Sequence, residues 1–447
     1  AWGGAGRDQT TPLLRSMEAR ARQTLRVRRL LGDHETRRVV PMAGAEQEYF
    51  LVDKALFARR PDLFTCGRTL FGAKPAKGQQ LDDHYYGNIK ERIIDYMREV
   101  DEELWELGVP AKTEHNEAAP AQHELAPVYA SANIACDQNQ LMMETLKKVA
   151  LRKDMVCLLH EKPFAWVNGS GKHNNWSLNL DGNKSLLDQG KTAESNERFL
   201  LFLVAVIWAV DEYAGLLRVS VSGPGNDQRL GGNEAPPAVI SVFLGDQLTD
   251  VLNELSTGKP SALRQGGNLQ MGVTTIPDLP KDIADRNRTS PFAFTGKKFE
   301  FRMLGSSMSI ADCNIIINTA VAEIVSRIAD RLEKAEDIHA ECRAIVQDVM
   351  RDHRRVIFNG NYYSGEWRRE ARQRGLPELV STVDAAGELI TQKSIALFEK
   401  HGVFTRKELE SRYEIRLEGY CKTVQIEAST MVEMTLRQII PAVTEYS

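Results

Sequence analysis

The sequence lacks a hydrophobic run long enough to cross a membrane. A transmembrane helix needs about 18 to 20 consecutive apolar residues. The longest apolar stretch, FLLFLVAVIWAV at 199–210, is bounded by Arg198 and Asp211 and predicts a buried helix. The N-terminal segment has no apolar signal-peptide core, and residues 19–31 read as the arginine-rich helix pattern ARARQTLRVRRLL. We therefore expect no membrane partner.

Cysteine is scarce and dispersed. The 447 residues include six cysteines. None belongs to a CxxC pair; they are Cys66, Cys136, Cys157, Cys313, Cys342 and Cys421. Disulfide frameworks and zinc sites use closely spaced cysteines, so the pattern indicates free thiols. We expect a cytoplasmic location.

The sequence has no large excess of positive charge and no GxxxxGK[ST] phosphate-binding loop. The net charge of −4 does not indicate a nucleic-acid partner, which would favour a basic surface. The sequence contains no GxxxxGK[ST] loop. If the protein binds ATP, it does so without a Walker P-loop. Metal ions and arginines are the alternative means of supporting phosphoryl transfer electrostatically.

The periodic segments predict strands and helices without regular βαβ alternation, which indicates an α+β fold. We expect strands at 39–52 and 155–159. Helices are expected at 10–32, 88–107, 131–153, 193–217, 237–255 and 309–356, the last interrupted near Ala335. Residues 255–290 are rich in loop signals. From Tyr363 onward the patterns are helical only, at 366–374, 384–401 and 405–444.

The most informative stretch is NGSGKHNNWSL at 168–178. Its two glycines allow a tight turn and close approach of a ligand to the backbone. His173 follows the turn directly, and the alternation after it predicts a half-buried strand. A turn that delivers a histidine to the start of a strand is typical of a functional site, although a solvent-facing turn histidine is the simpler alternative.

Three further segments place carboxylates on strands. In AGAEQEYFLVD, Glu46 and Glu48 are two residues apart, so a strand points both to one face. In HNEAAPAQHELAP, prolines break short extended pieces that carry Glu117 and Glu124. In KFEFR, Glu300 lies on a charged face opposite two phenylalanines.

Carboxylate oxygens are the ligands that magnesium and manganese prefer, and a neutral imidazole can join them. Any single glutamate here is adequately explained as a solvated strand residue paired with a lysine. The whole set is not, because crowded carboxylates without cations repel one another. The sequence therefore predicts a divalent metal site.

Five long sequence segments resemble glutamine synthetase, and their residues resemble the type III class of that family. They are EQEYFLVD, HNEAAPAQHELAP, HEKPFAWVNGSGKHNNWSL, NDQRLGGNEAPP and NRTSPFAFTGKKFEFR. The resemblance runs from about Thr10 to the C-terminus. It implies antiparallel strands that form an open barrel-like active site, backed by helices and followed by a C-terminal helical block.

The resemblance also implies a domain arrangement. We expect an N-terminal helical segment at 1–35, a catalytic domain at 36–356 and a helical region at 357–447. A complete type III chain would be longer, with a β-grasp domain before Ala1 and more helix after Ser447. In this family that domain supplies the neighbouring subunit with an aspartate for ammonium binding. The resemblance therefore implies that the 447-residue chain on its own makes little or no glutamine.

The resemblance assigns roles to individual residues. One metal ion would be held by Glu48, Glu117 and Glu124, and a second by Glu46, His173 and Glu300. Glutamate would contact Asn168, Gly169, Arg229 and Arg302, and the nucleotide would contact Ser177, Asn175 and Tyr85. Arg288 would stabilise the transferring phosphoryl group, and Glu234 would accept a proton from ammonium.

Two positions depart from the better-known classes. Asn175 stands where those classes often have histidine, and Ala293 stands where a second phosphate-binding arginine is expected. Lys298 shares the strand face of Glu300 and would compensate as a nucleotide-binding residue. The flanking His115 and His123 are interpreted as supporting or structural residues.

The implied activity is ATP-dependent ligation of ammonia to L-glutamate through γ-glutamyl phosphate, with ATP and two or three Mg²⁺ or Mn²⁺ ions. Its partners would be these small molecules, and the full-length protein would form a homo-oligomeric double ring. Two alternatives stay open. One is a catalytically incomplete remnant that binds nucleotide or metal, or co-assembles with full subunits. The other is a γ-glutamyl–amine ligase, against which the type III wording argues.

Overall fold

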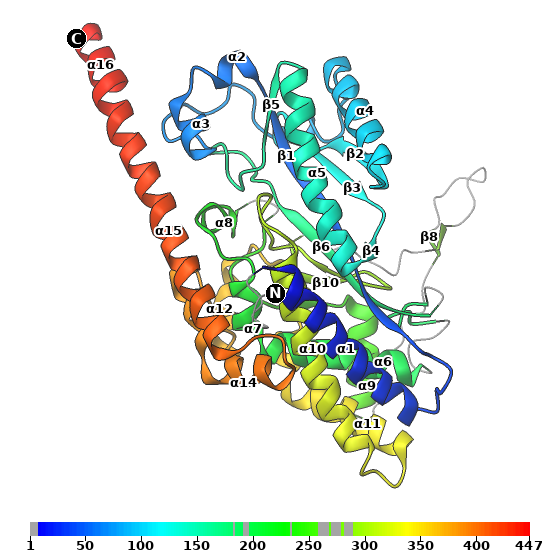
Figure 1. The fold of residues 1–447 in the computed structure, drawn as a ribbon. Coiled ribbons are helices and arrows are strands. Elements are labelled where there is room, and N and C mark those ends of the chain that lie inside the picture. The colour runs from blue at the N-terminus through cyan, green and yellow to red at the C-terminus, as the bar shows by residue number, and fades with distance from the viewer. Residues whose placement is uncertain are drawn as a thin grey trace.

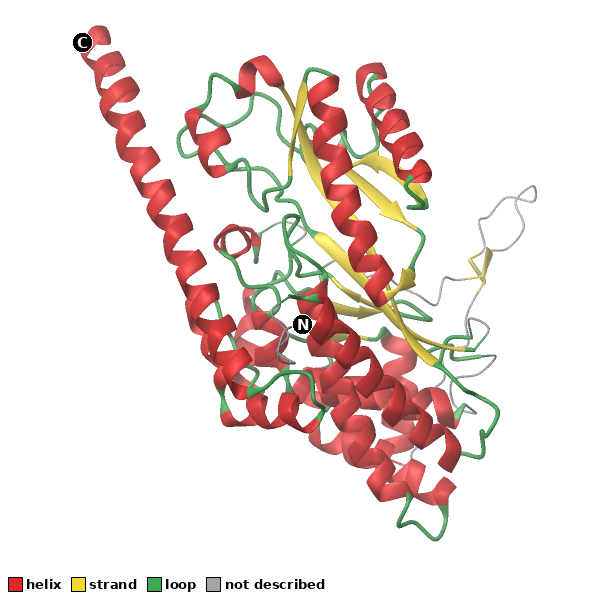
Figure 2. Ribbon diagram, viewed as in Figure 1, coloured by secondary structure: helices red, strands yellow, loops and turns green. Residues whose placement is uncertain are grey.

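A computed structural model describes residues 8–181, 184–190, 196–232, 235–257, 268–269, 279–280 and 289–447. Within these ranges one large sheet is covered by helices, and a separate helical block packs beside it (Figures 1 and 2). The predicted α+β class is confirmed.

The strands of the large sheet come from widely separated segments. They are β1 (Val39–Asp53), β2 (Ala111–Asn116), β3 (Gln122–Pro127), β4 (Ala130–Ser131), β5 (Met155–Leu158), β6 (Lys172–Leu180), β7 (Val242–Phe243), β10 (Phe292–Phe294) and β11 (Phe299–Phe301). The main order is β2-β3-β1-β6-β11-β10-β7, and β4 and β5 also pair with β1. A separate pair joins β8 (Asn268–Leu269) and β9 (Leu279–Pro280).

The large sheet is antiparallel, as expected, except at the edge formed by β7. Strand β7 runs parallel to β10, whereas the other described pairs of the large sheet are antiparallel. Between β7 and β10 the chain includes a complete helix, and parallel neighbours require such a long connection. The strand expected at 39–52 is confirmed as β1, which pairs with β3, β4, β5 and β6.

Two helices cover one face of the β1 to β3 region: α4 (Glu91–Glu106) and α5 (Ala132–Arg152). The apolar stripe of α4 packs with that of α5 and with the face of β1 that carries Tyr49 and Leu51. The opposite face of β1 carries Glu46 and Glu48, so these helices leave it free for the site.

The helical block has a long helix, α10 (Ala311–Leu332), at its centre. Helix α1 (Thr10–Leu30) lies along α10, and α6 (Glu197–Glu212) and α11 (Ile338–Asp352) also pack in this block. The predicted interruption near Ala335 is confirmed, because α10 and α11 are separate.

Three predicted helices are wrong in extent. The helix expected at 193–217 is divided at Tyr213 into α6 and α7 (Ala214–Val219), and residues 191–195 lie outside the described ranges. The helix expected at 237–255 contains β7, and α9 (Asp246–Thr257) starts only after Gly245, whose φ is +78°. Most of the loop-rich 255–290 is outside the described residues.

The third error is the helix expected at 384–401. It is divided into α13 (Thr382–Ala386), the 3-10 turn η4 (Gly387–Ile390) and α14 (Gln392–Lys400). Ser381 begins α13 with a capping box, and Thr391 caps α14. These local hydrogen bonds start two short helices where apolar periodicity alone predicted one.

The remaining helices are short, except for one at the C-terminus. They are α2 (Lys54–Phe57), α3 (Pro61–Cys66), α8 (Pro224–Arg229), α12 (Gly365–Gln373), α15 (Arg406–Met434) and α16 (Ile440–Tyr446), with 3-10 turns η2 (Gln80–Asp82) and η3 (Arg354–Val356) and a π-turn η5 (Thr435–Ile439). Helix α15 leaves the helical block and passes α3 on the sheet side of the molecule (Figure 1).

Two predicted absences can be compared with the structure. No helix among the described residues is long and apolar enough to span a membrane. All six cysteines are free thiols, as predicted.

Candidate active site

The register of four neighbouring strands brings the predicted metal ligands together. Glu48 on β1 is opposite Glu124 on β3, and Glu46 on β1 is opposite His173 on β6. Glu300 on β11 lies beside Asn175 of β6. Because paired residues of antiparallel strands point to the same face, these side chains converge there.

The convergence is close enough for shared ligation. The Nδ1 atom of His173 lies 3.2 Å from Oε2 of Glu46 and 3.3 Å from Oε1 of Glu300. Its Nε2 atom lies 3.6 Å from Oε1 of Glu48. The possible ligand atoms form two groups, and within each group they lie within 4.8 Å of one another. The groups are Glu46–His173–Glu300 and Glu48–Glu124–His173.

Glu117 completes the set from just beyond the end of β2. Its Oε1 atom is 3.0 Å from Nε2 of His115, and the same nitrogen is 3.4 Å from Oε1 of Glu124. These three residues form a third group within 4.8 Å. The structure therefore gathers all six predicted ligands and adds His115, which sequence analysis interpreted as a supporting residue.

The carboxylates strongly perturb one another. Burial, followed by repulsion from Glu46 and Glu117, holds the pKa of Glu124 well above its usual range. Burial also raises the pKa of Glu48. Burial and like-charge repulsion thus disfavour the charged forms of these two carboxyl groups.

His173 acts as the internal cation of the cluster. Burial and Arg302 lower its pKa, but hydrogen bonds to Glu300 and Glu46 outweigh both and raise it to about 10. For Glu46, burial raises the pKa, and the His173 hydrogen bond reverses the shift, so the net pKa is lowered.

The residues fit a divalent cation. Among the described residues, the buried Nε2 atom of His173 has no hydrogen-bond partner, although buried polar atoms rarely lack one. Facing carboxylates and one imidazole supply the donor types that suit Mg²⁺ and Mn²⁺. A cation would relieve both the repulsion and the unpaired nitrogen.

The glycine turn before β6 is packed too tightly for any side chain. A Cβ atom on Gly169 would lie 2.2 Å from the carbonyl oxygen of Glu161, and one on Gly171 would lie 2.2 Å from Nη2 of Arg229. The backbone nitrogen of Asn168 donates to Oε1 of Gln79 at 2.6 Å. The buried Oδ1 atom of Asn168 has no partner among the described residues and is available to a ligand.

The two predicted substrate arginines have different surroundings. Arg229, on α8, donates to Oδ1 of Asn226 and to the carbonyl oxygen of Leu304, both at 3.2 Å, and is 3 % exposed. Its guanidinium therefore supports the glycine turn in this structure. Nη1 of Arg302 lies 2.6 Å from Oε1 of Glu300, directly beside the acidic cluster.

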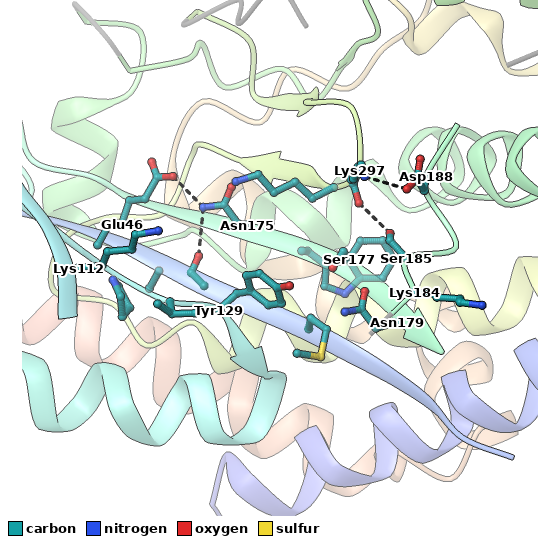
Figure 3. A pocket seen from close by; sticks show the side chains of 18 residues that line it. Glu46, Lys112, Tyr129, Asn175, Ser177, Asn179, Lys184, Ser185, Asp188 and Lys297 are labelled. Atoms are coloured by element: carbon teal, nitrogen blue, oxygen red, sulfur yellow. Dashed lines mark hydrogen bonds and ion pairs between the residues drawn. The ribbon is translucent and has the colours of Figure 1, made fainter. Parts of the chain in front are cut away.

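A cavity of about 770 Å³ opens next to the cluster. Figure 3 shows its lining, with Glu46 and Asn175 at one end and Ser185, Asp188 and Lys297 near the other. Nδ2 of Asn175 donates to Oε1 of Glu46 at 2.8 Å. Because Glu46 and Asn175 line the cavity, it adjoins the metal-ligand cluster directly.

Three of the four predicted nucleotide residues, Asn175, Ser177 and Lys298, line this cavity. Tyr85 does not; its ring centroid lies 5.9 Å from that of His115, on the other side of the cluster. Lys112, Tyr129, Lys184 and Lys297 also line it but were not predicted. Their segments are far apart in sequence and carry no shared motif, so only the tertiary fold reveals them.

The two predicted catalytic residues, Glu234 and Arg288, lie outside the described residues. Sequence reasoning also missed Gln47, which lies between the two glutamates of β1 and points to the opposite face. Its Nε2 atom donates to the carbonyl oxygen of Glu48 at 3.0 Å and to Oγ of Ser306 at 2.9 Å. Period-two alternation alone would have assigned it only to the buried face.

Comparison with known proteins agrees with this architecture. Residues 18–222 match the family described as glutamine synthetase, catalytic domain, and residues 341–447 match the glutamine synthetase C-terminal domain. The type-3 glutamine synthetase of Dictyostelium discoideum is 47% identical over 99% of this chain and 60% of its own length. A glutamine synthetase of Butyrivibrio fibrisolvens is 48% identical over 100% of this chain and 64% of its own.

Solved structures show the same fold at low identity. A structure titled "Apo GmaS without ligand" has a TM-score of 0.56 at 16% identity, covering 94% of this chain and 75% of its own. Another, "GmaS/ADP complex-Conformation 1", has a TM-score of 0.54 at 15% identity, covering 93% and 75%.

The chain belongs to the glutamine synthetase family. It spans 60% and 64% of the length of the two curated relatives described above.

Proposed function

We propose that the chain ligates ammonia to L-glutamate at the expense of ATP, giving L-glutamine, ADP and phosphate. The observation that carries the proposal is that the cavity lies beside the acidic cluster: Glu46 belongs to the cluster, and both Glu46 and Asn175 line the cavity. This arrangement suits a nucleotide whose terminal phosphates meet divalent cations beside a carboxylate substrate. The names of the relatives support the same activity.

The metal residues are Glu48, Glu117 and Glu124 for one ion, and Glu46, His173 and Glu300 for the other. Bound Mg²⁺ or Mn²⁺ would neutralise phosphate charge and polarise the phosphoryl group. We propose that Asn175, Ser177 and Lys298 hold the nucleotide in the cavity they line.

Glutamate binding is proposed at the glycine turn. Arg302 grips a substrate carboxylate, Asn168 and Gly169 line the site, and Arg229 completes it either directly or by supporting the turn. A planar guanidinium suits this role because it can bind a carboxylate through two parallel hydrogen bonds. Positioning of this kind places the γ-carboxylate for in-line attack.

The reaction takes two steps. An oxygen of the γ-carboxylate attacks the terminal phosphorus of ATP, the bond to ADP breaks, and γ-glutamyl phosphate forms. Ammonia then attacks the activated acyl carbon, and phosphate leaves with the bonding electron pair. We propose that Arg288 neutralises the transferring phosphoryl group and that Glu234 takes the proton from ammonium.

The proposal extends to the whole protein. We propose a cytoplasmic enzyme that forms a homo-oligomeric double ring, as the family resemblance implies. Assembly is testable separately, by the mass of the protein in solution under the conditions of the assay.

The test is glutamine formation from glutamate, ammonium and ATP, with Mg²⁺ or Mn²⁺, measured by chromatography on the 447-residue chain and on the chain joined to the N-terminal domain of a longer relative. We expect the joined protein and its Glu102→Gln variant to be active, because Glu102 is exposed on α4, and its Glu124→Gln variant to be inactive. No glutamine from a folded joined protein that binds Mn²⁺ and a nucleotide analogue would overturn the proposal and favour a non-catalytic remnant. Faster turnover of an alkylamine than of ammonia would instead favour an amine ligase.

A further inference from the structure

We propose that His115 is itself a metal ligand and gives the ion bound by Glu117 and Glu124 a nitrogen donor. The inference rests on the proposed function, since it concerns the same metal cluster. It changes the expected ligand set from carboxylates alone to a mixed nitrogen and oxygen set.

Strand register fixes the position of His115. It lies directly opposite Glu124 in the β2–β3 pair, so both side chains are on the face that carries the cluster. Its Nε2 atom is 3.0 Å from Oε1 of Glu117 and 3.4 Å from Oε1 of Glu124. One nitrogen between two carboxylate oxygens, all within 4.8 Å, is an arrangement that a single cation can satisfy.

The carboxylate of Glu124 supplies independent evidence for a cation at this point. Glu124 is 7 % exposed, yet no hydrogen bond to its carboxylate is found among the described residues, and its ion-pair contact there is His115. Its neighbour across β1 is another carboxylate, Glu48. A buried carboxylate that faces a like charge and whose ion-pair partner lies 3.4 Å away is costly unless a cation pairs with it.

One carboxylate oxygen of Glu48 already accepts two hydrogen bonds from the protein. Its Oε2 atom accepts from the backbone nitrogen of Gly171 at 2.7 Å and from Nε2 of Gln122 at 3.1 Å. Oε1 of Glu48 therefore remains on the side of the cluster, 3.6 Å from His173. The His115 side chain is 34 % exposed, against 10 % for Glu117 and 9 % for Glu124, so it lies at the more open side of this group.

The alternative role for His115 is to donate a hydrogen bond that orients Glu117. The two roles predict different metal chemistry. Imidazole nitrogen favours Mn²⁺ and later transition ions over Mg²⁺, which prefers oxygen. A ligand at His115 therefore sets the metal preference of the site, whereas an orienting residue would weaken binding of both ions alike.

The decisive measurement is pulsed electron paramagnetic resonance of Mn²⁺ bound to the wild-type chain, with histidine labelled by ¹⁵N. We expect nitrogen couplings from two histidines, His173 and His115. In His115→Gln one coupling should disappear, and the ratio of Mn²⁺ to Mg²⁺ affinity, measured by competition, should fall about tenfold. His339→Gln is the matched control, since His339 is exposed and pairs with Glu197 in the helical block.

A wild-type spectrum with one histidine coupling would overturn the inference without requiring any variant. An unchanged metal-affinity ratio in folded His115→Gln would do the same, and His115→Asn provides a second variant of similar chemistry. Failure of this inference is distinguishable from failure of the proposed function. In the first case the wild-type chain binds Mn²⁺ with one coupling and the joined protein makes glutamine; in the second the joined protein makes no glutamine.

Discussion

Glu48 and Glu124 are directly opposite each other in the register of β1 and β3, and both are buried. Like charges in this position destabilise a sheet, so the pair weakens the protein unless a cation binds between the strands. The relationship connects stability to metal occupancy and gives the first prediction.

At a pH high enough to ionise both carboxyl groups, we expect Glu124→Gln to stabilise the metal-free chain by up to about 1 kcal/mol, because it removes one of two facing charges. We also expect the variant to lose most of the rise in melting temperature that Mn²⁺ gives the wild type, since bound ligand stabilises the folded state. Thermal unfolding with EDTA and with Mn²⁺ measures both effects. An equal Mn²⁺ response in Glu124→Gln and wild type would contradict the metal assignment; Glu102→Gln is the surface control.

Arg302→Lys should raise the KM for glutamate about tenfold or more, because loss of a charged hydrogen bond costs roughly 1.5–3 kcal/mol. Lysine keeps the charge but cannot form the two parallel hydrogen bonds of a guanidinium. Initial rates at varied glutamate and fixed ATP measure the effect. An unaltered KM for glutamate with unaltered KM for ATP would exclude Arg302 from the substrate site.

A fully buried polar network lies behind the cluster, and Asn139 on α5 is its centre. Oδ1 of Asn139 accepts from Nζ of Lys172 at 2.9 Å, and its Nδ2 donates to Oε1 of Gln47 at 3.3 Å. Gln47 in turn holds the carbonyl oxygen of Glu48. The network thus connects α5 to the two strands that carry Glu48 and His173.

Asn139→Leu should lower the free energy of unfolding by about 1–3 kcal/mol, because Lys172 and Gln47 each lose a buried partner. We also expect weaker Mn²⁺ binding in the folded variant, since the ligand strands lose their support. Denaturant unfolding and calorimetric titration with Mn²⁺ separate the two. Lower stability with wild-type Mn²⁺ affinity would show that the network supports only the fold. Asn133→Leu, in the first turn of the same helix, is the control.

The sequence predicted the local parts of this arrangement well, and the reason is physical. Alternation along β1 placed Glu46 and Glu48 on one face, because the side-chain period of a strand is two. The same pattern gave no information about Asn139, whose importance depends on a helix packing behind the sheet. The break at Tyr213 and the short strand β7 depend on tertiary contacts that outweigh local periodicity.

An ion cluster around the buried Glu323 of the helical block gives a pH-dependent prediction that is independent of the site. Glu323 contacts Nζ of Lys400 at 2.7 Å, Nε2 of His401 at 2.8 Å and Nε of Arg327 at 2.9 Å. Burial raises the pKa of Glu323, but these three partners outweigh burial and lower it to about 2.

Because the folded pKa of Glu323 is below its usual value near 4.5, its stabilisation is present above pH 4.5 and disappears as the pH falls toward 2. Glu323→Gln should therefore cost about 2 kcal/mol or more at neutral pH, and the difference from wild type should narrow below pH 4.5. Urea unfolding from pH 8 to pH 3.5 tests this. Glu333→Gln, at a surface pair with Arg26, should change stability little at any pH in this range, because solvent screens an exposed pair.

The last prediction concerns the cavity beside the cluster. Ser177 on β6 lines it, between Asn175 and Asn179 on the same face of the strand. Phenylalanine at this position, four residues after His173 on β6, would occupy part of the space of about 770 Å³. We therefore expect Ser177→Phe to weaken binding of a fluorescent ATP analogue at least tenfold while Mn²⁺ binding in the absence of nucleotide is retained. Thr423→Phe, at an exposed position on α15, should change neither. Undiminished binding of the analogue by Ser177→Phe would mean that the nucleotide lies elsewhere. It would contradict the proposal that Asn175, Ser177 and Lys298 bind the nucleotide.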